Sequence, residues 1–116
     1  MTTGKPVSAA FLAMALGALA AQALSSQAHA DPAAGRKLVE EVCQQCHGLD
    51  GLALEADAPN LAGQNRSYLA RQLWAFRAGE RQDPKMSPSA VGLSDQDIID
   101  VAEWYSSIDI AVKSPQ

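Results

Sequence analysis

The sequence predicts a small, all-α domain with three main helices joined by two irregular loops. Apolar residues recur at helical spacing in three separate segments. Gly, Pro and Asn gather between these segments, where they favour turns and loops. No stretch shows the sustained alternation of β-branched residues that is typical of strands, so a sheet is not expected.

Residues 1–30 have the pattern of a secretory signal peptide. Lys5 is their only formal charge, an apolar and Ala-rich run extends over 9–24, and a small-x-small triplet, Ala-His-Ala, occupies 28–30. We expect cleavage after Ala30. The alternative is an uncleaved membrane anchor, but the apolar run is shorter than the roughly 20 residues that span a bilayer.

Cleavage after Ala30 would leave a mature domain of 86 residues, 31–116, with 8 basic and 13 acidic residues. This acidic balance argues against a nucleic-acid partner, which needs a basic face. Two cysteines are too few for a disulfide-stapled scaffold. Because so short a chain builds only a marginal core, we expect something besides side chains to fill it.

The first helix is expected to begin at Asp31, which can cap it, with Pro32 at the first helical position. The apolar residues among 38–42 form one face as this helix runs towards Cys43. Residues 48–66 then predict a loop with one helical turn.

The second helix is expected over 67–78, with Gly79 ending it. Residues 80–92 predict another loop, and Ser94 opens the last helix, where acidic residues in the first turn suit the helix dipole. The apolar face of the second helix consists of Tyr68, Leu69, Leu73 and Phe76, and that of the last of Ile98, Val101, Ala102, Tyr105 and Ile108.

Residues 43–47 read Cys-Gln-Gln-Cys-His, the C-x-x-C-H signature of covalent haem attachment. On a helical turn these positions share one face. Cys43 and Cys46 can therefore each form a thioether to a haem vinyl group while His47 reaches the iron. Gly48 follows, where the chain must leave the ring plane without a side chain in the way.

Other interpretations of the motif are a redox-active dithiol, a zinc site and a structural disulfide. A redox C-x-x-C expects a preceding strand in a βαβ unit, which the sequence does not predict. A structural zinc site typically needs four Cys or His ligands, whereas residues 31–116 offer three. A disulfide would leave the adjacent His47 unexplained.

Met86 is the expected second iron ligand. It is the only thioether of the predicted mature chain, which has no second histidine, and His/Met coordination is one of the standard haem c arrangements. Otherwise the sixth position would be open, as in a gas-binding haem protein, or taken by a weaker donor such as Lys85.

Further short motifs extend this pattern along the chain. They are Ala34-Gly35, Cys43-Gln44-Gln45-Cys46-His47-Gly48, Ala58-Pro59-Asn60-Leu61-Ala62-Gly63-Gln64, Tyr68-Leu69, Gln72-Leu73, Phe76-Arg77-Ala78-Gly79, Arg81, Met86, Leu93-Ser94-Asp95 and Trp104-Tyr105. Together they resemble the small class I c-type cytochromes, in particular the cytochrome c4 and c553-like group, over essentially all of 31–116. Cytochrome c4 has two such domains, whereas this chain has one.

The resemblance implies a class I cytochrome c fold, with helices and loops wrapped around one covalent haem. His47 would be the proximal iron ligand and Met86 the distal one, and the Pro59 carbonyl would accept a hydrogen bond from His47. Gly35 would let the first helix cross the last near Trp104 or Tyr105. Val39 departs from the aromatic residue that relatives often carry, so this crossing is expected to pack less fully.

The function expected from these features is electron transfer in the periplasm by a haem c carrier that is not an enzyme. Redox proteins would be its partners, without stable membrane insertion after cleavage, and the oligomeric state stays open. The alternative is an electron-accepting haem subunit of a larger periplasmic oxidoreductase.

Two electrostatic hypotheses concern the basic segment 66–86. Arg71 or Arg77 is a candidate to pair with a haem propionate, since Arg–carboxylate bonds are strong, and Trp74 is placed near a propionate or the surface. The segment has five basic and two acidic residues, between two acidic segments. Such a field would orient the molecule towards a partner; a solvated mixture with no orienting role is the alternative.

Overall fold

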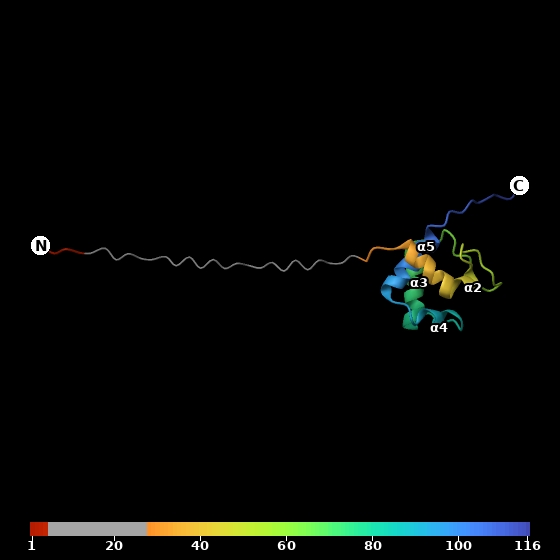
Figure 1. Cartoon of the computed structure of the whole chain (residues 1–116), viewed down its shortest axis with the longest axis horizontal. Coiled ribbons are helices and arrows are strands. Elements are labelled where there is room, and N and C mark those ends of the chain that lie inside the picture. Colours follow the sequence, from red (N-terminus) through yellow and green to blue (C-terminus); the bar gives the residue numbers. More distant parts are fainter. Residues whose placement is uncertain (5–27) are drawn as a thin grey trace.

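The computed structural model describes residues 1–4 and 28–116, so most of the predicted signal peptide lies outside the described residues. Within 28–116 the chain forms helices and loops and contains no strand, which confirms the predicted all-α class (Figure 1). None of the described helices is both long enough and apolar enough to span a membrane. The elements are α1 (Pro32–Leu38), the π-helical turn η1 (Val39–Cys43), α2 (Gln44–His47), α3 (Arg66–Ala78), α4 (Met86–Ala90) and α5 (Asp95–Ser106).

The chain from α1 to α2 forms one continuous helical run that ends on the C-x-x-C-H motif. Asp31 caps α1 as predicted, because its carboxylate accepts hydrogen bonds from the backbone N–H groups of Ala33 and Ala34. The wide turn η1 then changes the helical phase before the motif, and such π-turns are frequent at functional sites. Val39, at the start of this turn, is fully buried in the core.

Helices α1 and α5 cross at Gly35, where an added methyl group would collide with the carbonyl group of Asp100. The expected crossing is confirmed: Gly35 meets α5 about one turn before Trp104, and Arg36 of α1 lies over the Trp104 ring, 5.8 Å from its centroid. Trp104 and Tyr105 also bond the segment after the motif. Asp100 is buried and accepts a hydrogen bond of 2.8 Å from the N–H of Asp31. The start of α1 is thereby fixed to α5.

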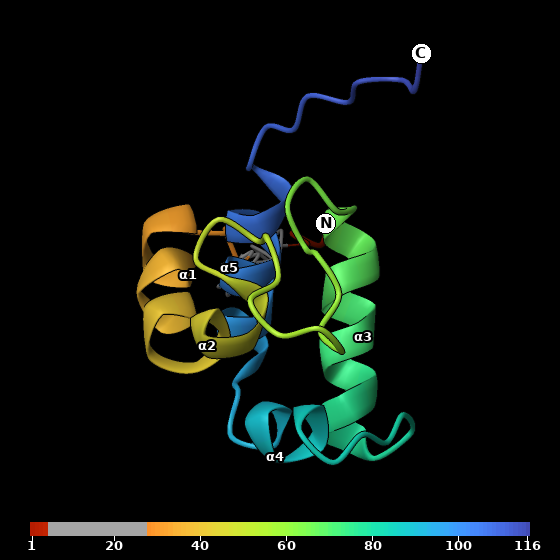
Figure 2. The ribbon, with the colours of Figure 1, turned by 90° about the vertical axis from the view of Figure 1, so that its right-hand side faces the viewer.

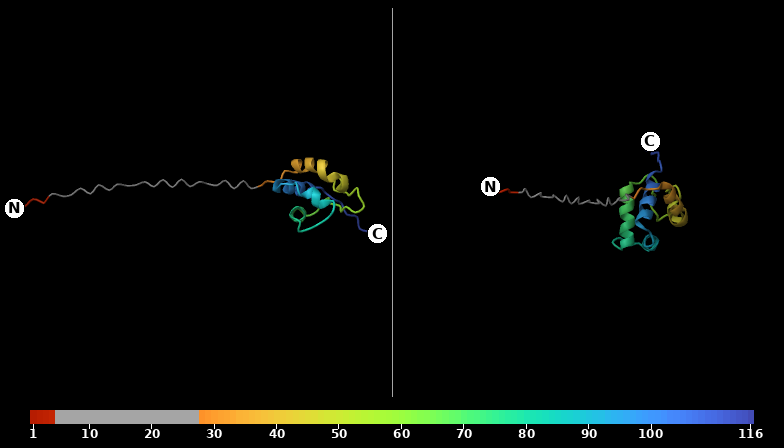
Figure 3. Two further views of the ribbon diagram at one scale, coloured as in Figure 1. Left: turned by 90° about the horizontal axis from the view of Figure 1, so that it is seen from below. Right: turned by 60° about the vertical axis from the view of Figure 1, so that its left-hand side comes forward.

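Helix α3 packs beside α5 and reaches α4 at its far end (Figures 2 and 3). It begins at Arg66, one residue earlier than expected, because the Asn65 side chain accepts the Tyr68 N–H and caps it. The predicted stop is confirmed, since Gly79 adopts the left-handed conformation with φ 75°. Helix α5 opens on a capping box between Ser94 and Asp97.

The two predicted loops differ from expectation. The segment between α2 and α3 contains turns but no helix, and Gly51 holds it together by accepting hydrogen bonds from Leu61 and Ala62. Residues 80–92 are not a continuous loop, because α4 forms within them. Its Pro88 falls in the first turn, where a missing N–H breaks no helical hydrogen bond, so proline there is compatible with a helix.

The core lies where α1, α3 and α5 meet. Its buried members include four of the five residues predicted on the face of α5, and Ile108, just beyond the helix, packs against them partly buried. The buried core cluster consists of Val39, Leu69, Ala70, Ile98, Val101, Ala102 and Tyr105.

Candidate cofactor site

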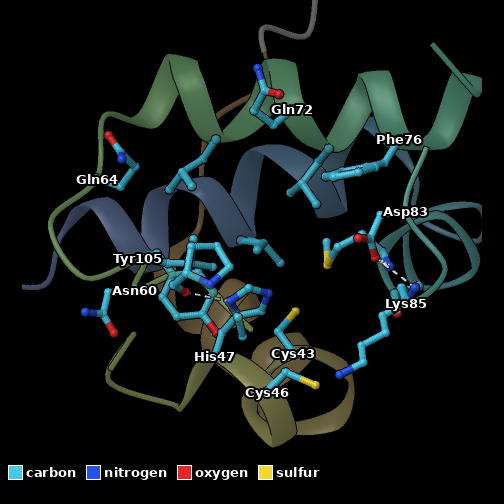
Figure 4. Close-up of a pocket in the computed structure, with 18 of the residues that line it drawn as sticks. Cys43, Cys46, His47, Asn60, Gln64, Gln72, Phe76, Asp83, Lys85 and Tyr105 are labelled. Atoms are coloured by element: carbon cyan, nitrogen blue, oxygen red, sulfur yellow. Dashed lines mark hydrogen bonds between the residues drawn. The ribbon is translucent and has the colours of Figure 1, made fainter. Parts of the chain in front are cut away.

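A cavity of about 370 Å³ opens between the motif, α3, α4 and α5 (Figure 4). This volume is within the range of cofactor pockets. Leu69, Leu73, Phe76 and Val101 give it apolar walls, so the apolar face predicted for α3 faces this cavity. The cavity brings together all the predicted site residues: Cys43, Cys46, His47, Pro59 and Met86.

His47 is oriented by the loop that follows it. Its Nδ1 lies 2.9 Å from the carbonyl oxygen of Pro59, and the residue is 7% exposed. Because a carbonyl oxygen only accepts, Nδ1 must carry the proton, which leaves Nε2 with a free lone pair. The imidazole is thus held as the tautomer that can bind a metal through Nε2.

Two aromatic residues of α5 fix the chain where it leaves the motif. The buried Tyr105 hydroxyl donates a 2.9 Å hydrogen bond to the carbonyl of Gly48, and the Trp104 indole N–H donates one of the same length to Leu49. The sequence interpretation treated both residues as packing and missed these bonds. The available signal was chemical, because buried Tyr and Trp carry a polar group that usually finds a partner.

The two cysteines are unbonded and their side chains lie beside His47 at the cavity (Figure 4). Burial raises the pKa of the Cys43 thiol to about 11. A redox-active dithiol requires a lowered thiol pKa, so this environment disfavours that alternative. Among the described residues, no group of three or more His, Cys, Asp or Glu side chains is arranged to hold a metal ion.

Met86 is placed by a tight turn that the sequence interpretation missed. The Asp83 carboxylate accepts 2.8 Å hydrogen bonds from the backbone N–H groups of both Lys85 and Met86. The hydrogen bond from the Met86 N–H, and after it the one from the Lys85 N–H, hold the pKa of the Asp83 carboxyl below its usual value. An Asp shortly before the methionine is the residue type that forms such turns, so this signal was present in the sequence.

Lys85 links the methionine segment to the loop after the motif. Its ammonium group lies 2.9 Å from the Glu55 carboxylate and 3.1 Å from that of Asp57. Hydrogen bonds to Glu55 and Asp57 raise the pKa of Lys85, so its amine stays protonated. Since a protonated amine cannot bind a metal, this arrangement disfavours Lys85 as an axial ligand.

Neither arginine proposed for the haem propionates lines the cavity. Arg77 instead bonds the Leu93 carbonyl and the Asp95 carboxylate, which Trp74 also bonds. The hydrogen bond from Arg77, and after it the one from Trp74, lower the pKa of the Asp95 carboxyl. Ion pairs also neutralise much of the basic segment, which reduces its capacity to orient the molecule. The pairs are Arg66–Glu103, Arg77–Asp95, Lys85–Glu55 and Lys85–Asp57.

The donor set of this cavity fits a c-type haem. Cys43 and Cys46 offer thiols for vinyl groups, His47 offers an imidazole nitrogen, and Met86 supplies a thioether at the same cavity. The apolar walls suit the faces of a porphyrin.

Comparison with known proteins agrees with this fit. The family model described as cytochrome c oxidase, cbb3-type, subunit III matches residues 30–104. Cytochrome c-554(548) of Halomonas halodenitrificans is 45% identical over 80 residues, which cover 66% of this chain and 95% of that protein. Cytochrome c4 of Pseudomonas aeruginosa is 38% identical over 91 residues, or 77% of this chain and 45% of that protein.

Two further matches cover only part of their proteins. The "thiosulfate dehydrogenase electron acceptor" of Stutzerimonas stutzeri is 38% identical over 97 residues, which cover 83% of this chain and 42% of that protein. The solved structure of cytochrome c4 from Acidithiobacillus ferrooxidans matches with a TM-score of 0.63 and 32% identity, over 72% of this chain and 53% of that one. The chain thus spans nearly all of one relative but about half or less of these longer ones. On this evidence the chain belongs to the cytochrome c family, has the all-α class I cytochrome fold, and binds haem c covalently.

Proposed function

We propose that this protein is a periplasmic electron carrier whose haem iron is bound by His47 and Met86. Family membership supports electron transfer by haem c. The observation that carries the finer proposal is that an oriented imidazole and the only thioether of residues 31–116 line one cavity.

The residues around the cavity suit this task. When bound, the haem supplies an iron that cycles between ferric and ferrous states, and methionine sulfur favours the ferrous form. The Pro59 carbonyl holds the His47 ring and raises its basicity. The apolar walls from α3 and α5 limit the access of water, which also affects the potential.

Axial ligation is tested by the long-wavelength sulfur-to-iron absorption band of the ferric holoprotein. We expect the band in the unmodified protein and its loss in Met86→Ala, with covalent haem retained. Val91→Ala is the matched control, because Val91 follows α4, is 68% exposed and does not line the cavity. Absence of the band from the unmodified protein, or ready carbon monoxide binding by its reduced form, would overturn Met86 as the ligand.

The periplasmic location rests on the signal-peptide pattern of residues 1–30. Expression of the full chain should give a haem protein in the periplasmic fraction whose N-terminus is Asp31. Holoprotein that stays with the membrane fraction and retains residues 1–30 would instead support the anchored alternative.

The second candidate is a haem subunit that accepts electrons within a larger periplasmic oxidoreductase. The name of the Stutzerimonas stutzeri relative, an electron acceptor of thiosulfate dehydrogenase, favours it. A native extract separated by size distinguishes the two. The carrier is expected to elute without a second kind of polypeptide, whereas elution together with one would support the subunit.

A further inference from the structure

Arg81 lies on the wall of the cavity, directly after α3. Its guanidinium carbon is 4.5 Å from the centroid of the Phe76 ring, within reach of a cation–π contact. Its Nη1 donates a 2.6 Å hydrogen bond to the side-chain oxygen of Gln72, and its backbone N–H donates to Ala75. The guanidinium is therefore fixed in place by contacts on two sides.

These contacts leave the charge of Arg81 without a bound carboxylate. Among the described residues, Arg36, Arg66 and Arg77 each form an ion pair, whereas Arg71 and Arg81 form none, and of these two only Arg81 lines the cavity. Asp83 is close enough for Arg81 to lower its pKa, but its Oδ1 accepts the N–H groups of Lys85 and Met86. Arg81 thus retains N–H donors beside the cavity that Gln72 does not use.

The position of this arginine relative to the cysteines matters. Figure 4 shows Gln72 on α3, across the cavity from Cys43 and Cys46. The vinyl groups of haem lie on one edge of the ring and the propionates on the opposite edge. Once the cysteines hold the vinyl edge, the propionate edge must point away from them.

We propose that Arg81, held by Gln72 and Phe76, binds a haem propionate. The planar guanidinium matches a carboxylate, and such charge-assisted bonds are the strong ones. Arg81 thereby takes the role for which the sequence suggested Arg71 or Arg77. The proposal needs a bound haem but not Met86 as its ligand, so the two can fail independently.

The test compares the reduction potentials of the holoproteins Arg81→Gln and Arg71→Gln across pH. Both variants lose one positive charge from the same segment, but only Arg81 lines the cavity. Arg81→Gln should have the lower potential of the two, because loss of a nearby cation favours the more positive ferric form. The pKa of the propionate is seen as the pH at which the reduction potential changes. This pKa should rise by about one unit or more in Arg81→Gln alone.

Two further variants define the remaining outcomes. Arg81→Lys should give an intermediate reduction potential, since lysine keeps the positive charge but lacks the planar guanidinium that matches a carboxylate. Gln72→Leu should shift the potential in the same direction as Arg81→Gln but by less, and it tests the proposal if Arg81→Gln does not fold. Equal potentials and equal propionate pKa values in the Arg81 and Arg71 variants would overturn the proposal, as would a Gln72→Leu protein that is unchanged. The sulfur-to-iron band, recorded on every variant, reports separately on axial ligation.

Discussion

The two sides of the cavity are held by different kinds of contact. The histidine side, residues 47–61, is fastened to α5 through hydrogen bonds from Tyr105 and Trp104 and to itself through Pro59. The methionine side, residues 83–90, depends on the half-buried Asp83 turn and on the exposed ion pairs of Lys85. Its only regular element is the five-residue helix α4.

This difference predicts the order in which the two sides of the cavity unfold. Buried hydrogen bonds gain strength in a low-dielectric interior, whereas exposed ion pairs contribute little and are screened by salt. Segments held by exposed contacts open at a lower free energy than the core. With Met86 as the proposed iron ligand, we therefore expect denaturant to detach it from the iron before the histidine side unfolds.

The largest loss of stability is expected from Gly35→Ala, which disrupts the crossing of α1 with α5, the helix to which the histidine side is bonded. The added methyl group meets the backbone of Asp100, which cannot move aside as a flexible side chain would. The free energy of unfolding should fall by about 3 kcal/mol, the upper end for overpacking. Urea unfolding of the holoprotein measures it.

Gly92→Ala is the control for this substitution, since an added methyl group there meets nothing within 4 Å. It should alter the free energy of unfolding by less than about 0.5 kcal/mol. Equal stability of the two variants would show that α1 and α5 do not cross at Gly35.

An intermediate effect is expected from Tyr105→Phe, which removes the donor from the buried Gly48 carbonyl. An unsatisfied buried acceptor costs about 1–3 kcal/mol. The histidine side should weaken while the methionine side does not, so global unfolding should move towards the denaturant concentration at which the sulfur-to-iron band is lost. Ser107→Ala is the control, because its exposed hydroxyl also bonds a backbone carbonyl, that of Trp104. Equal free energies of unfolding for the two variants would show that the buried Tyr105 bond stabilises the fold no more than the exposed Ser107 bond does.

Local patterns in the sequence were sufficient for much of the fold. Capping residues such as Asp31 and Ser94 act through neighbouring backbone groups, so they mark helix starts without tertiary information. Gly79 ends α3 for an equally local reason. Helix α4 was missed because Pro84, Pro88 and Gly92 predict a loop, and proline does not reveal that it falls in a first helical turn.

The site residues were predictable where spacing alone determines chemistry, as in the C-x-x-C-H motif. Contacts between distant segments were not. Local spacing does not show whether Arg71, Arg77 or Arg81 lines the cavity, because this depends on how α3 and the residues directly after it pack. The same holds for Lys85, whose acidic partners lie about 30 residues earlier in the chain.

The smallest of the three effects is expected from Asp83→Ala, which acts on the methionine side alone. It removes the acceptor of the Lys85 and Met86 N–H groups, so Met86 should leave the iron a few-fold more readily. The sulfur-to-iron band should then disappear at a lower urea concentration, while unfolding followed by far-UV circular dichroism should barely move. Asp97→Ala is the matched control, because this carboxylate bonds Ser94 at the start of α5. Asp97→Ala should lower the urea midpoint of global unfolding, and the sulfur-to-iron band should still be lost in a separate, earlier step. If Asp83→Ala shifted both signals together, the methionine side would unfold with the core and the two sides would be one cooperative unit.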